Sequence, residues 1–417
     1  MIQPPAPAAR PAPHTPATGA RQSSLREANL ALVVRTVLAA PAPPTRAAVA
    51  AATGMTRATA ARLVDELVEG GVLDERDPPE AAGRGRPARP LAGGRRIAAL
   101  GLQVNVTFLA GRVLDLSGGV LAEFREPGDF RASDPAAVLA RLGDLARSLV
   151  ASLPDGTRLV GTGVALPGIV SADTGTLLVA PNLGWSDVRP ADHLGPPGDH
   201  PGVPGGHLGV PGAHVGNEAE MAARSAAESA PGRPGPVRDF LYLSGEIGLG
   251  GATVLGGAVV PGRHGWAGEI GHVCVDPDGP PCPCGSTGCL ERYAGRDALL
   301  GTAGLPLDAP LSALADRVRA GDPAARRAVD AAVRALGVAL SGAINLLDVP
   351  VVLLGGHLAE IAELIVPRLR PVLERRVLSA RWVTPRVEAH AGGPAPGATG
   401  AALLRLADVV QYPSRWL

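Results

Sequence analysis

The sequence contains no lysine, so all 39 of its basic residues are arginines. A lysine Schiff base and a lysine phosphate clamp are therefore both excluded. Aromatic residues make up 3% of the chain and hydrophobic residues 46%, so any core must be built mainly from Ala, Val and Leu. At 417 residues the chain exceeds a typical single domain, and we expect two or three folded units.

The sequence also lacks an uninterrupted run of roughly 20 apolar residues, the length that a helix needs to cross a bilayer. Residues 1–22 are rich in Pro and Ala, carry dispersed charge and lack the apolar centre of a secretory leader. We therefore expect residues 1–22 to be a disordered tail. We also expect the protein to be cytoplasmic, with no membrane partner.

Charge is unevenly distributed, although the net charge of the chain is zero. Residues 1–96 contain 13 arginines and 8 acidic residues, whereas the remainder contains 26 arginines and 31 acidic residues. This modest asymmetry is typical of a small nucleic-acid-binding module joined to an acidic ligand-binding body.

Three of the four cysteines fall with one histidine in a segment rich in Gly and Pro, residues 268–295. A neutral imidazole and three thiolates form a complete tetrahedral zinc set, which leaves no coordination position for a substrate or a catalytic water. We therefore predict a structural zinc ion. Its predicted ligands are His272, Cys282, Cys284 and Cys289.

Two alternatives to the zinc site are a loop with incidental cysteines and a disulfide. Four cysteines in 417 residues fit a reducing compartment, in which disulfides are rare. The fourth cysteine, Cys274, lies in a Val-Cys-Val run that is typical of a strand. We expect it to be a small buried side chain and not a ligand.

In this segment, Gly-Glu-x-Gly-His is followed by Cys-x-Cys-Gly-x-x-Gly-Cys-x-Glu. The combination resembles the signature of the ROK family, a group of sugar kinases and sugar-responsive repressors that includes xylose and N-acetylglucosamine repressors. The resemblance extends from about residue 97 to about residue 408. It implies a two-lobed, ribonuclease-H-like fold of the actin and hexokinase type, but it does not choose between kinase and repressor.

Local patterns in the body of the chain agree with an α/β fold. Residues 97–110 and 112–116 read as paired strands, 135–153 as a helix and 159–166 as a buried strand. Strands that alternate with helices indicate an α/β sheet. Over residues 97–417, the family resemblance implies a sugar-binding ROK domain with the structural zinc.

The amino-terminal part has the pattern of a helix-turn-helix. Apolar residues recur at helical spacing over 24–39, a second short helix fits 45–52, and a Thr-Gly-Met turn precedes a third helix that runs to about residue 68. Thr56 is the predicted N-cap of the third helix. This part resembles the winged helix at the start of ROK repressors, so we assign residues 23–90 to a winged helix-turn-helix DNA-binding domain. The main alternative is a generic three-helix interaction module.

The third helix is the predicted DNA-reading helix. Leu63, Val64 and Leu67 point to the core, which leaves side chains near the amino-terminal end exposed. Arginines there can meet guanine edges or phosphates, and small residues permit close approach. The predicted DNA-binding residues of this helix are Thr56, Arg57, Ala58, Thr59 and Arg62.

A Gly-Arg-Gly-Arg-Pro segment follows at residues 83–87. Such a segment is narrow and extended, so Arg84 and Arg86 can enter a minor groove from a wing. The alternative is a solvated linker between two domains.

Four histidines recur seven residues apart, at His193, His200, His207 and His214. Even spacing suggests metal binding, but the Gly and Pro residues between the histidines do little to fix a coordination geometry. We favour an expanded surface loop.

The family resemblance also implies a sugar pocket. Carboxylates and amides suit it because they accept from and donate to vicinal hydroxyls, and His272 could bind zinc through one ring nitrogen and sugar through the other. A purely structural role is the alternative for each of these side chains. The residues that the resemblance assigns to the sugar are Gly168, Asn182, Asn217, Glu218, Glu269, His272 and Glu291.

Several positions depart from the pattern that the resemblance implies for a kinase. Gln103 stands in place of the acid that organises magnesium, and Glu218 stands in place of the catalytic aspartate. Glu246 and Ile247 replace a glycine and a threonine of the phosphate loop. A longer base is misplaced by about one bond length, and an added carboxylate repels phosphate. We therefore predict that the protein is not an enzyme.

These patterns together indicate a transcriptional regulator, most simply a sugar-controlled repressor with a structural zinc ion. A single helix-turn-helix usually gains affinity by pairing, so we expect a homodimer or a higher homo-oligomer on a double-stranded operator. The main alternative is a sugar kinase that transfers phosphate from ATP to a hexose and carries a fused DNA-binding module. A scaffold that binds neither sugar nor DNA is the third reading.

Overall fold

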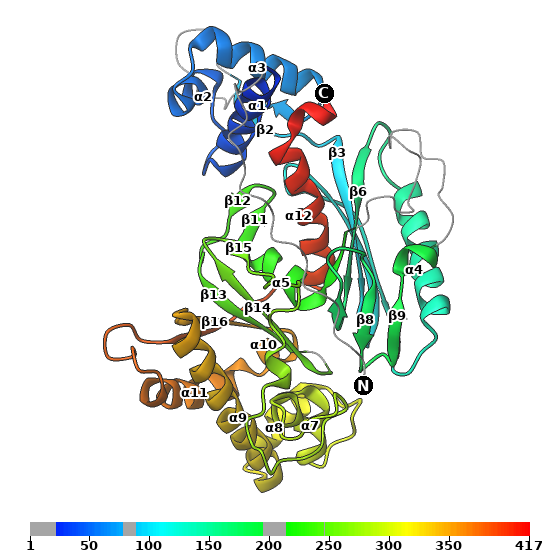
Figure 1. Ribbon diagram of the computed structural model, residues 1–417, viewed down its shortest axis with the longest axis vertical. Coiled ribbons are helices and arrows are strands. Elements are labelled where there is room, and N and C mark those ends of the chain that lie inside the picture. The colour runs from blue at the N-terminus through cyan, green and yellow to red at the C-terminus, as the bar shows by residue number, and fades with distance from the viewer. Residues whose placement is uncertain (1–21, 78–88, 195–213, 246) are drawn as a thin grey trace, which may run out of the picture.

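The computed structural model describes residues 22–77, 89–194, 214–245 and 247–417. It shows a small helical domain next to two larger α/β lobes, with the carboxy-terminal helix running between the lobes and the small domain (Figure 1). All but the last residue of the expected tail lies outside the described residues. The same holds for Arg84, Arg86, Glu246, His200 and His207.

The small domain is a helix-turn-helix followed by two antiparallel strands. Its elements are α1 (Gln22–Ala39), α2 (Arg46–Thr53), α3 (Arg57–Glu69), β1 (Leu73–Glu75) and β2 (Leu91–Gly93). Thr45 and Thr56 accept hydrogen bonds from backbone N–H groups in the first turns of α2 and α3. Gly54 ends α2 in the left-handed conformation, which glycine adopts without strain. The predicted helices are confirmed, with ends shifted by a residue or two.

The first lobe is built on a five-stranded sheet. Its strands follow the order β10 (His214–Asn217), β6 (Arg158–Leu166), β3 (Ile97–Val104), β4 (Phe108–Asp115) and β5 (Val120–Pro127). β3, β4 and β5 form an antiparallel meander, while β6 and β10 continue the sheet in parallel. α4 (Pro135–Ala151) packs Leu139 and Leu142 against Leu100 and Leu102, which lie on one face of β3.

The predicted first hairpin has the right pairing but the wrong turn. Its two strands end and begin on either side of residues 105–107, and not at residue 111. Asn105 Oδ1 accepts hydrogen bonds from the backbone N–H and the hydroxyl of Thr107, both at 2.9 Å. The side chain of Asn105 therefore builds the turn, as asparagine commonly does.

The second lobe repeats the plan of the first. Its strands follow the order β15 (Ala258–Val259), β14 (Leu249–Leu255), β13 (Phe240–Gly245), β16 (Val351–Gly355) and β17 (Arg386–Ala389). An antiparallel meander is again extended by two parallel strands. Two lobes with matching strand order confirm the predicted two-lobed α/β fold, and their cores consist mainly of Ala, Val and Leu.

Helices on the far side of the second sheet form the largest core. They are α6 (Glu291–Ala294), α7 (Arg296–Thr302), α8 (Leu311–Arg319), α9 (Pro323–Leu347), α10 (Gly356–Glu360) and α11 (Ala362–Arg376). α9 is long and apolar enough to cross a membrane, but 56% of its most apolar window is buried against the other helices and the sheet. It is the central helix of this core.

Two helices lie between the sheets and tie the lobes together. α5 (Glu218–Ala227) follows the first sheet and packs on β13 and β14 of the second, whereas α12 (Pro396–Gln411) follows the second sheet and packs on β3 and β6 of the first. Glycines permit the contacts: a Cβ at Gly101 would lie 1.8 Å from the carbonyl oxygen of Ala398, and one at Gly400 would lie 1.7 Å from that of Met221.

The small domain shares one hydrophobic core with the first lobe. Leu30, Val33 and Val37 of α1 pack in the same cluster as Leu406 and Val409 of α12. The start of β3 and the end of β4 join this cluster. Figure 1 shows α12 passing from the lobes to α1. The small domain is therefore docked on the first lobe and α12.

Short elements complete the chain. They are β7 (Ile169–Val170), β8 (Leu177–Ala180), β9 (Trp185–Val188), β11 (Glu228–Ala230), β12 (Arg233–Pro234) and the 3-10 turns η1 (Pro190–Asp192), η2 (Ile270–His272) and η3 (Pro413–Trp416). β7, β8 and β9 form a separate three-stranded sheet. Several residues of this small sheet line a pocket between the two lobes.

Candidate functional site

A pocket of about 680 Å³, which we call the central pocket, lies between the two lobes. It is lined by the loop after β6, by the end of β10 and the start of α5, by the turn between β13 and β14, and by the segment around η2. The structure brings together every residue that the sequence assigned to the sugar. These residues are Gly168, Asn182, Asn217, Glu218, Glu269, His272 and Glu291.

Asn217 is held rigidly at the start of α5. Its Oδ1 accepts hydrogen bonds from the backbone N–H groups of Ala219 and Glu220, at 2.7 and 3.2 Å, so it is the N-cap of the helix. Its Nδ2 donates to the carbonyl oxygen of Gly168 at 2.9 Å. Asn217 thus orients the loop at Gly168 and the first turn of α5, which carries Glu218.

Glu218 is buried at the floor of the central pocket. Its Oε1 accepts hydrogen bonds from Gln103 Nε2 and Asn105 Nδ2, both at 2.6 Å. Burial raises the pKa of this carboxyl to about 6, against the lowering effect of the Asn105 and Gln103 hydrogen bonds. The two amides therefore hold a carboxylate that faces the pocket and is desolvated.

In another part of the pocket lining, two carboxylates flank one imidazole. His272 Nε2 lies 3.9 Å from Glu269 Oε2, and His272 Nδ1 lies 3.7 Å from Glu291 Oε1. Burial raises the pKa of Glu269. A Cβ at Gly248 would lie 2.7 Å from both Asn182 Nδ2 and Glu291 Oε2, so glycine is required for these polar groups to converge.

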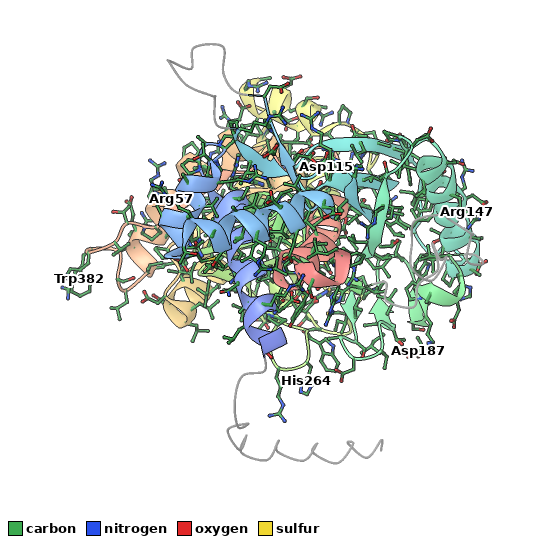
Figure 2. The ribbon with its side chains drawn as sticks, turned by 90° about the horizontal axis from the view of Figure 1, so that it is seen from above. Arg57, Asp115, Arg147, Asp187, His264 and Trp382 are labelled. Atoms are coloured by element: carbon green, nitrogen blue, oxygen red, sulfur yellow. The ribbon has the colours of Figure 1, made fainter. Side chains whose placement is uncertain are left out.

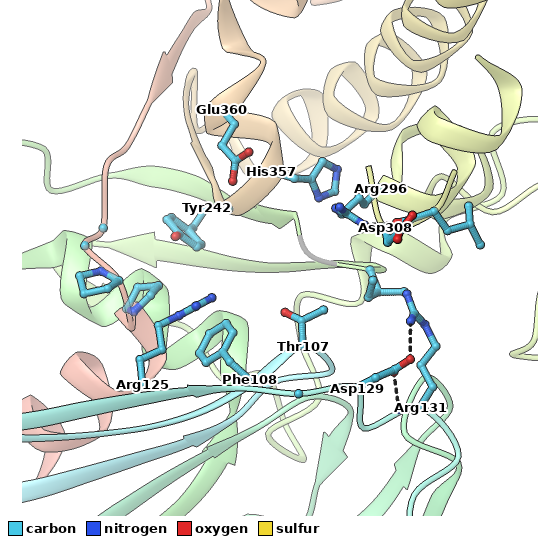
Figure 3. A pocket seen from close by; sticks show the side chains of 18 residues that line it. Thr107, Phe108, Arg125, Asp129, Arg131, Tyr242, Arg296, Asp308, His357 and Glu360 are labelled. Atoms are coloured by element: carbon cyan, nitrogen blue, oxygen red, sulfur yellow. Dashed lines mark hydrogen bonds and ion pairs between the residues drawn. The ribbon is translucent and has the colours of Figure 1, made fainter. Parts of the chain in front are cut away.

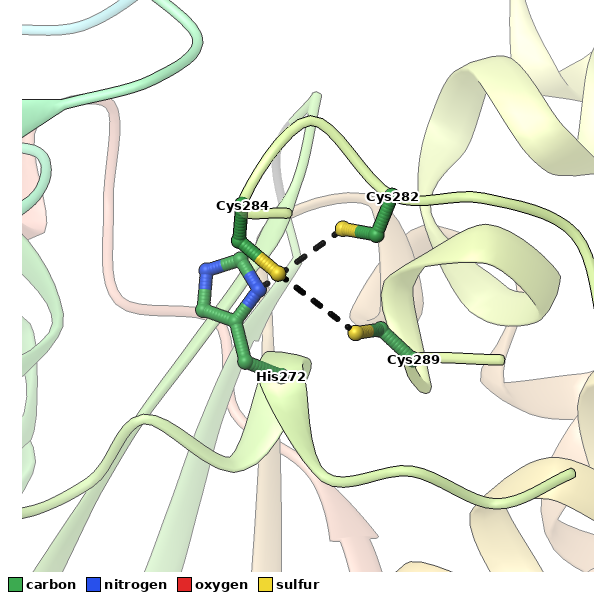
Figure 4. A group of neighbouring side chains, drawn as sticks. All are labelled: His272, Cys282, Cys284 and Cys289. Atoms are coloured by element: carbon green, nitrogen blue, oxygen red, sulfur yellow. Dashed lines mark hydrogen bonds between the residues drawn. The ribbon is translucent and has the colours of Figure 1, made fainter. Parts of the chain in front are cut away.

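His272 and three cysteines form a compact group, which we call the metal cluster (Figure 4). The ligand atoms of His272, Cys282, Cys284 and Cys289 all lie within 4.8 Å of one another. Cys284 Sγ is 3.7 Å from Cys289 Sγ, and Cys282 Sγ is 3.9 Å from His272 Nδ1. Ligands bound at about 2.3 Å around a tetrahedral ion lie about 3.8 Å apart, so the spacing fits a metal.

The metal cluster also orients a side chain of the central pocket, that of His272. His272 turns Nδ1 toward the sulfurs and Nε2 toward Glu269. Cys284 lines both the cluster and the central pocket. Burial and the neighbouring Glu291 carboxylate raise the pKa of the Cys282 thiol, whereas a bound cation would favour its thiolate form.

Cys274 lies outside the metal cluster, as expected, but the prediction that it is buried is wrong. Its thiol is exposed. The backbone forms only an isolated antiparallel bridge to Cys289 in place of the predicted strand. A single bridge gives no second sheet layer to cover the side chain, which therefore faces solvent.

A second cavity, of about 820 Å³, lies beside the turns at Thr107 and Ile247 (Figure 3). Arg125 lies over the ring of Phe108, 4.0 Å from its centre. Arg131 pairs with Asp129 and Asp297, and Arg296 donates to the carbonyl oxygens of Leu307 and Ala309. The cavity adjoins the turn that follows the strand of Gln103, and it also adjoins Ile247, which lies in the phosphate loop that the resemblance implies for a kinase.

The candidate DNA-binding helix, α3, presents the side chains that the sequence predicted. Leu63, Val64 and Leu67 are buried, whereas Arg57 and Arg62 are exposed. Arg62 pairs with Glu66 at 2.5 Å. Within the described part of the chain, Arg57 forms no ion pair. Thr56, Ala58 and Thr59 lie in the same first turn, with the Thr56 and Thr59 hydroxyl oxygens 2.9 Å apart.

Sequence reasoning missed Asn105, which lines the central pocket, and the supporting role of Gln103 behind it. It treated Gln103 only as the loss of a magnesium-organising acid and gave Asn105 no part in the pocket, although both donate hydrogen bonds to Glu218. The signal was present: a polar amide at either side of Val104 in an otherwise apolar strand needs a buried partner.

Comparison with known proteins decides the family. The ROK family profile matches residues 100–408. The chain belongs to the ROK family. An IclR-type helix-turn-helix domain matches residues 29–77, so this ROK protein carries a DNA-binding module.

The relatives include regulators and kinases. The chain is 24% identical to the xylose repressor of Caldicellulosiruptor bescii, over 93% of this chain and 98% of the repressor. It is 27% identical to the glucokinase of Streptomyces coelicolor, over 73% of this chain and 96% of the kinase. The kinase match therefore leaves more than a quarter of this chain uncovered.

A solved structure supports the same architecture. A ROK family transcriptional regulator, a homologue of the Escherichia coli MLC protein, superposes with a TM-score of 0.72 at 22% identity. The superposition covers 93% of this chain and 98% of that one. It shows a shared fold over nearly the whole length of both chains.

Proposed function

We propose that this protein is a transcriptional repressor whose binding to an operator in double-stranded DNA is controlled by a sugar in the central pocket. The observation that carries the proposal is the continuous core that joins the winged helix to β3 and α12 of the pocket-bearing lobe. Three carboxylates and three side-chain amides line the pocket, which suits a ligand with several hydroxyl groups. The relative named xylose repressor supports this choice.

We infer that the sugar is bound and not phosphorylated. Gln103, at the position of the kinases' magnesium-organising acid, uses both ends of its amide in hydrogen bonds to Glu218 and Ala398. Oε1 of Glu218, the candidate base, is already shared by two amide donors. A neutral amide supplies no charge for magnesium, and a carboxylate whose Oε1 already accepts two hydrogen bonds is a weaker base toward a hydroxyl proton. Ile247, which replaces the threonine hydroxyl, adds a third obstacle.

We propose that the metal is zinc and that its role is structural. Three thiolates and one imidazole are the ligands zinc prefers, and they fill all four tetrahedral positions. When bound, the ion would fix the segment that carries Glu269 and Glu291 and orient His272 toward the sugar. The metal thus shapes the pocket and leaves no site for a catalytic water.

The proposed DNA contacts are the first turn of α3 and the wing. Thr56, Arg57, Ala58, Thr59 and Arg62 would meet the major groove, and Arg84 and Arg86 the minor groove. The proposed domain limits are 23–90 for the winged helix and 97–417 for the sugar-binding body. A regulator of this kind works in the cytoplasm, in contact with DNA.

We propose that two copies pair through an exposed apolar patch on the second lobe. Its members are Leu346, Leu347, Leu378, Trp382 and Val383, with exposures of 46% to 85%. Asn345 joins the two segments by hydrogen bonds to Arg376 and Leu378. Figure 2, viewed from above the small domain, shows Trp382 at the edge on the same side as Arg57. A two-fold axis there would bring two α3 helices to one face of DNA.

The patch has a direct test. Replacing both Leu378 and Trp382 with serine is expected to convert a dimer into a monomer in sedimentation-velocity runs and to weaken operator binding at least tenfold. The paired exposed residues Arg319 and Glu363, changed to alanine, serve as the control. An unchanged sedimentation coefficient in the Leu378→Ser, Trp382→Ser variant would remove the patch from the dimer interface.

The proposed function is tested by DNA-mobility shift with the region upstream of the protein's own gene. The protein is titrated against this DNA without sugar and with each member of a panel of hexoses, pentoses and N-acetylated sugars. We expect binding in the nanomolar range that one class of sugar changes at least tenfold. Failure to bind this DNA under any condition would contradict the proposal.

The kinase alternative is tested by a coupled assay of ADP production with ATP, magnesium and the same sugars. We expect only background ADP. Sustained, sugar-dependent ADP production would overturn our reading of Gln103, Glu218 and Ile247.

The wing is tested by replacing Arg84 and Arg86 with alanine. Each phosphate contact contributes about 0.9 to the slope of log affinity against log salt, so the slope should fall by roughly 2 and affinity at moderate salt by roughly tenfold or more. The control replaces Arg368, which lies on the second lobe and pairs with Asp330. An unaltered salt slope would return residues 83–87 to the status of a linker.

A further inference from the structure

Gln103 occupies a buried position between the central pocket and α12. It is 2% exposed at the end of β3. Its Nε2 donates to Glu218 Oε1 at 2.6 Å, and its Oε1 accepts from the backbone N–H of Ala398 at 3.0 Å. One planar amide therefore connects a pocket carboxylate to the first turn of α12.

The bond to Ala398 supplies a helix cap that α12 otherwise lacks. The N-cap residue, Ala395, has no side chain able to accept a hydrogen bond from the first turn. Packing is close as well, because a Cβ at Gly397 would lie 2.8 to 3.0 Å from three atoms of the Gln103 amide. The first turn of α12 is thus held against Gln103 by both a hydrogen bond and contact.

The other end of α12 reaches the DNA-binding domain. Its 16 residues span about 24 Å at 1.5 Å per residue. Leu406 and Val409 pack with Leu30 and Val34 of α1 in one cluster. Movement of α12 would therefore be transmitted to α1 through packed side chains.

The segment after α12 fastens it to the same domain. The Ser414 hydroxyl and backbone N–H both donate to the carboxylate of Glu27 on α1. Arg158 donates to the carbonyl oxygens of Gly70 and Trp416, at 3.2 and 3.1 Å. Gly70 directly follows α3. The end of the chain is thereby tied to both the first and the third helix of the winged domain.

We infer that Gln103 is a positioning residue that couples sugar in the central pocket to α12 and, through α12, to the winged helix. This inference rests on the proposed function. Among the described residues, no hydrogen bond reaches Oε2 of Glu218, so that oxygen can accept a sugar hydroxyl. A hydroxyl there draws the carboxylate toward the pocket and weakens its bond to Gln103. The planar amide of Gln103 then cannot keep both of its hydrogen bonds, one to Glu218 and one to the backbone of Ala398.

The chemistry requires an amide at this position. An aspartate, which the resemblance implies at the matching position of the kinases, can only accept hydrogen bonds when ionised and is one methylene shorter. It could not donate to Glu218 while accepting from Ala398. A glutamine at position 103 therefore allows the pocket to be coupled to α12, in addition to removing the acid that would organise magnesium.

The test separates coupling from binding and from folding. Gln103→Met keeps the length and flexibility of the side chain and removes both hydrogen bonds. Thr399→Ala is the matched control: Thr399 lies in the same turn of α12, but its hydroxyl bonds Arg112 and Ala395, away from the pocket. D-xylose, D-glucose and N-acetyl-D-glucosamine are the sugar probes. Sugar affinity is measured by calorimetry and operator affinity by fluorescence anisotropy.

We expect the ratio of operator affinities with and without the effective sugar to fall at least fivefold toward 1 in Gln103→Met. Its sugar affinity should change less than fivefold, because Asn105 still holds Glu218. Thr399→Ala should keep the wild-type ratio. In wild type, but not in Gln103→Met, sugar should change the hydrogen exchange of the first-turn amides of α12.

Two results overturn the inference while leaving the proposed function intact. One is a Gln103→Met protein with the full sugar-dependent ratio. The other is equal loss of the ratio in Thr399→Ala, which would point to general loosening of α12. A wild-type protein that binds sugar and DNA independently, or binds neither, overturns the proposed function and this inference together. If Gln103→Met does not fold, the exchange experiment on wild type decides: unaltered α12 amides on sugar binding refute the coupling.

Discussion

The two sides of the central pocket differ in how they are held. On one side, Glu269, His272 and Glu291 lie in the loop segment of the metal cluster and keep the sequence signature of the ROK family. On the other side, Glu218 lies at the start of α5 and is held by hydrogen bonds from Gln103 and Asn105. One group of pocket residues thus depends on a cluster of candidate metal ligands nearby in the sequence, and the other on amides brought in from a distant strand.

The largest effect is expected when one ligand of the metal cluster is removed. Cys284→Ser removes one of four ligands, and an incomplete set binds zinc far more weakly. We expect the metal content to fall from one zinc per chain to below about one tenth. We also expect the melting temperature to drop by roughly 10 °C or more, since the free energy of metal binding stabilises the fold. Metal analysis by mass spectrometry and calorimetric melting provide the readouts.

Cys274→Ser is the matched control for that experiment. Cys274 lies in the same segment but is exposed and outside the cluster. Its replacement should change neither the metal content nor the melting temperature. Full zinc retention in Cys284→Ser would remove Cys284 from the ligand set and weaken the contrast between the two sides of the pocket.

A smaller effect is expected from the carboxylate next to His272. Glu269→Gln keeps the shape of the side chain but replaces a charged acceptor by a neutral one, and a hydrogen bond to a charged group contributes about 1.5–3 kcal/mol. Sugar affinity should therefore fall between about tenfold and a hundredfold by calorimetry, with zinc content unchanged. Glu388→Gln, an exposed position on β17, is the control. Sugar affinity that is equal in Glu269→Gln and wild type would place the sugar elsewhere.

Local sequence signals predicted the local structure well. The third helix was placed to within about a residue because Thr56 caps it and Gly54 ends the helix before it. The metal cluster was predicted because all four ligands lie within 18 residues and zinc requires few ligand types. The turn at Asn105 was missed because it contains neither Gly nor Pro and depends on a side-chain hydrogen bond.

Contacts between distant segments could not be read from the sequence. Gln103 and Glu218 are separated by 115 residues, and Gln103 and Ala398 by 295. Their meeting depends on how α12 packs against β3, which glycines such as Gly101 permit. Only the family resemblance predicted that the residues assigned to the sugar lie in one pocket. The sequence alone does not show that the loop after β6 and the start of α5 share a pocket with His272 and Cys284.

The smallest expected effect is a pH dependence of stability that arises from Glu218, the carboxyl group held by Gln103 and Asn105. The pKa of Glu218 is raised from 4.5 to about 6 in the folded protein, mainly by burial. Between these values the folded chain holds a proton that the unfolded chain releases, so stability falls as pH rises from about 4.5 to about 6. One unit of pKa shift corresponds to about 1.4 kcal/mol, so the loss is about 2 kcal/mol at most.

Glu218→Gln removes this titration while keeping the size of the side chain. The melting temperature of the variant, taken relative to wild type, should therefore rise between pH 4.5 and pH 6 and stay level from pH 7 to pH 8. Glu69→Gln, at an exposed position in the last turn of α3, should show no such trend. A difference between Glu218→Gln and wild type that does not vary with pH would mean that Glu218 keeps an ordinary pKa. The surroundings of Glu218 would then be more hydrated than its burial indicates. The two sides of the central pocket would differ less in how they are held.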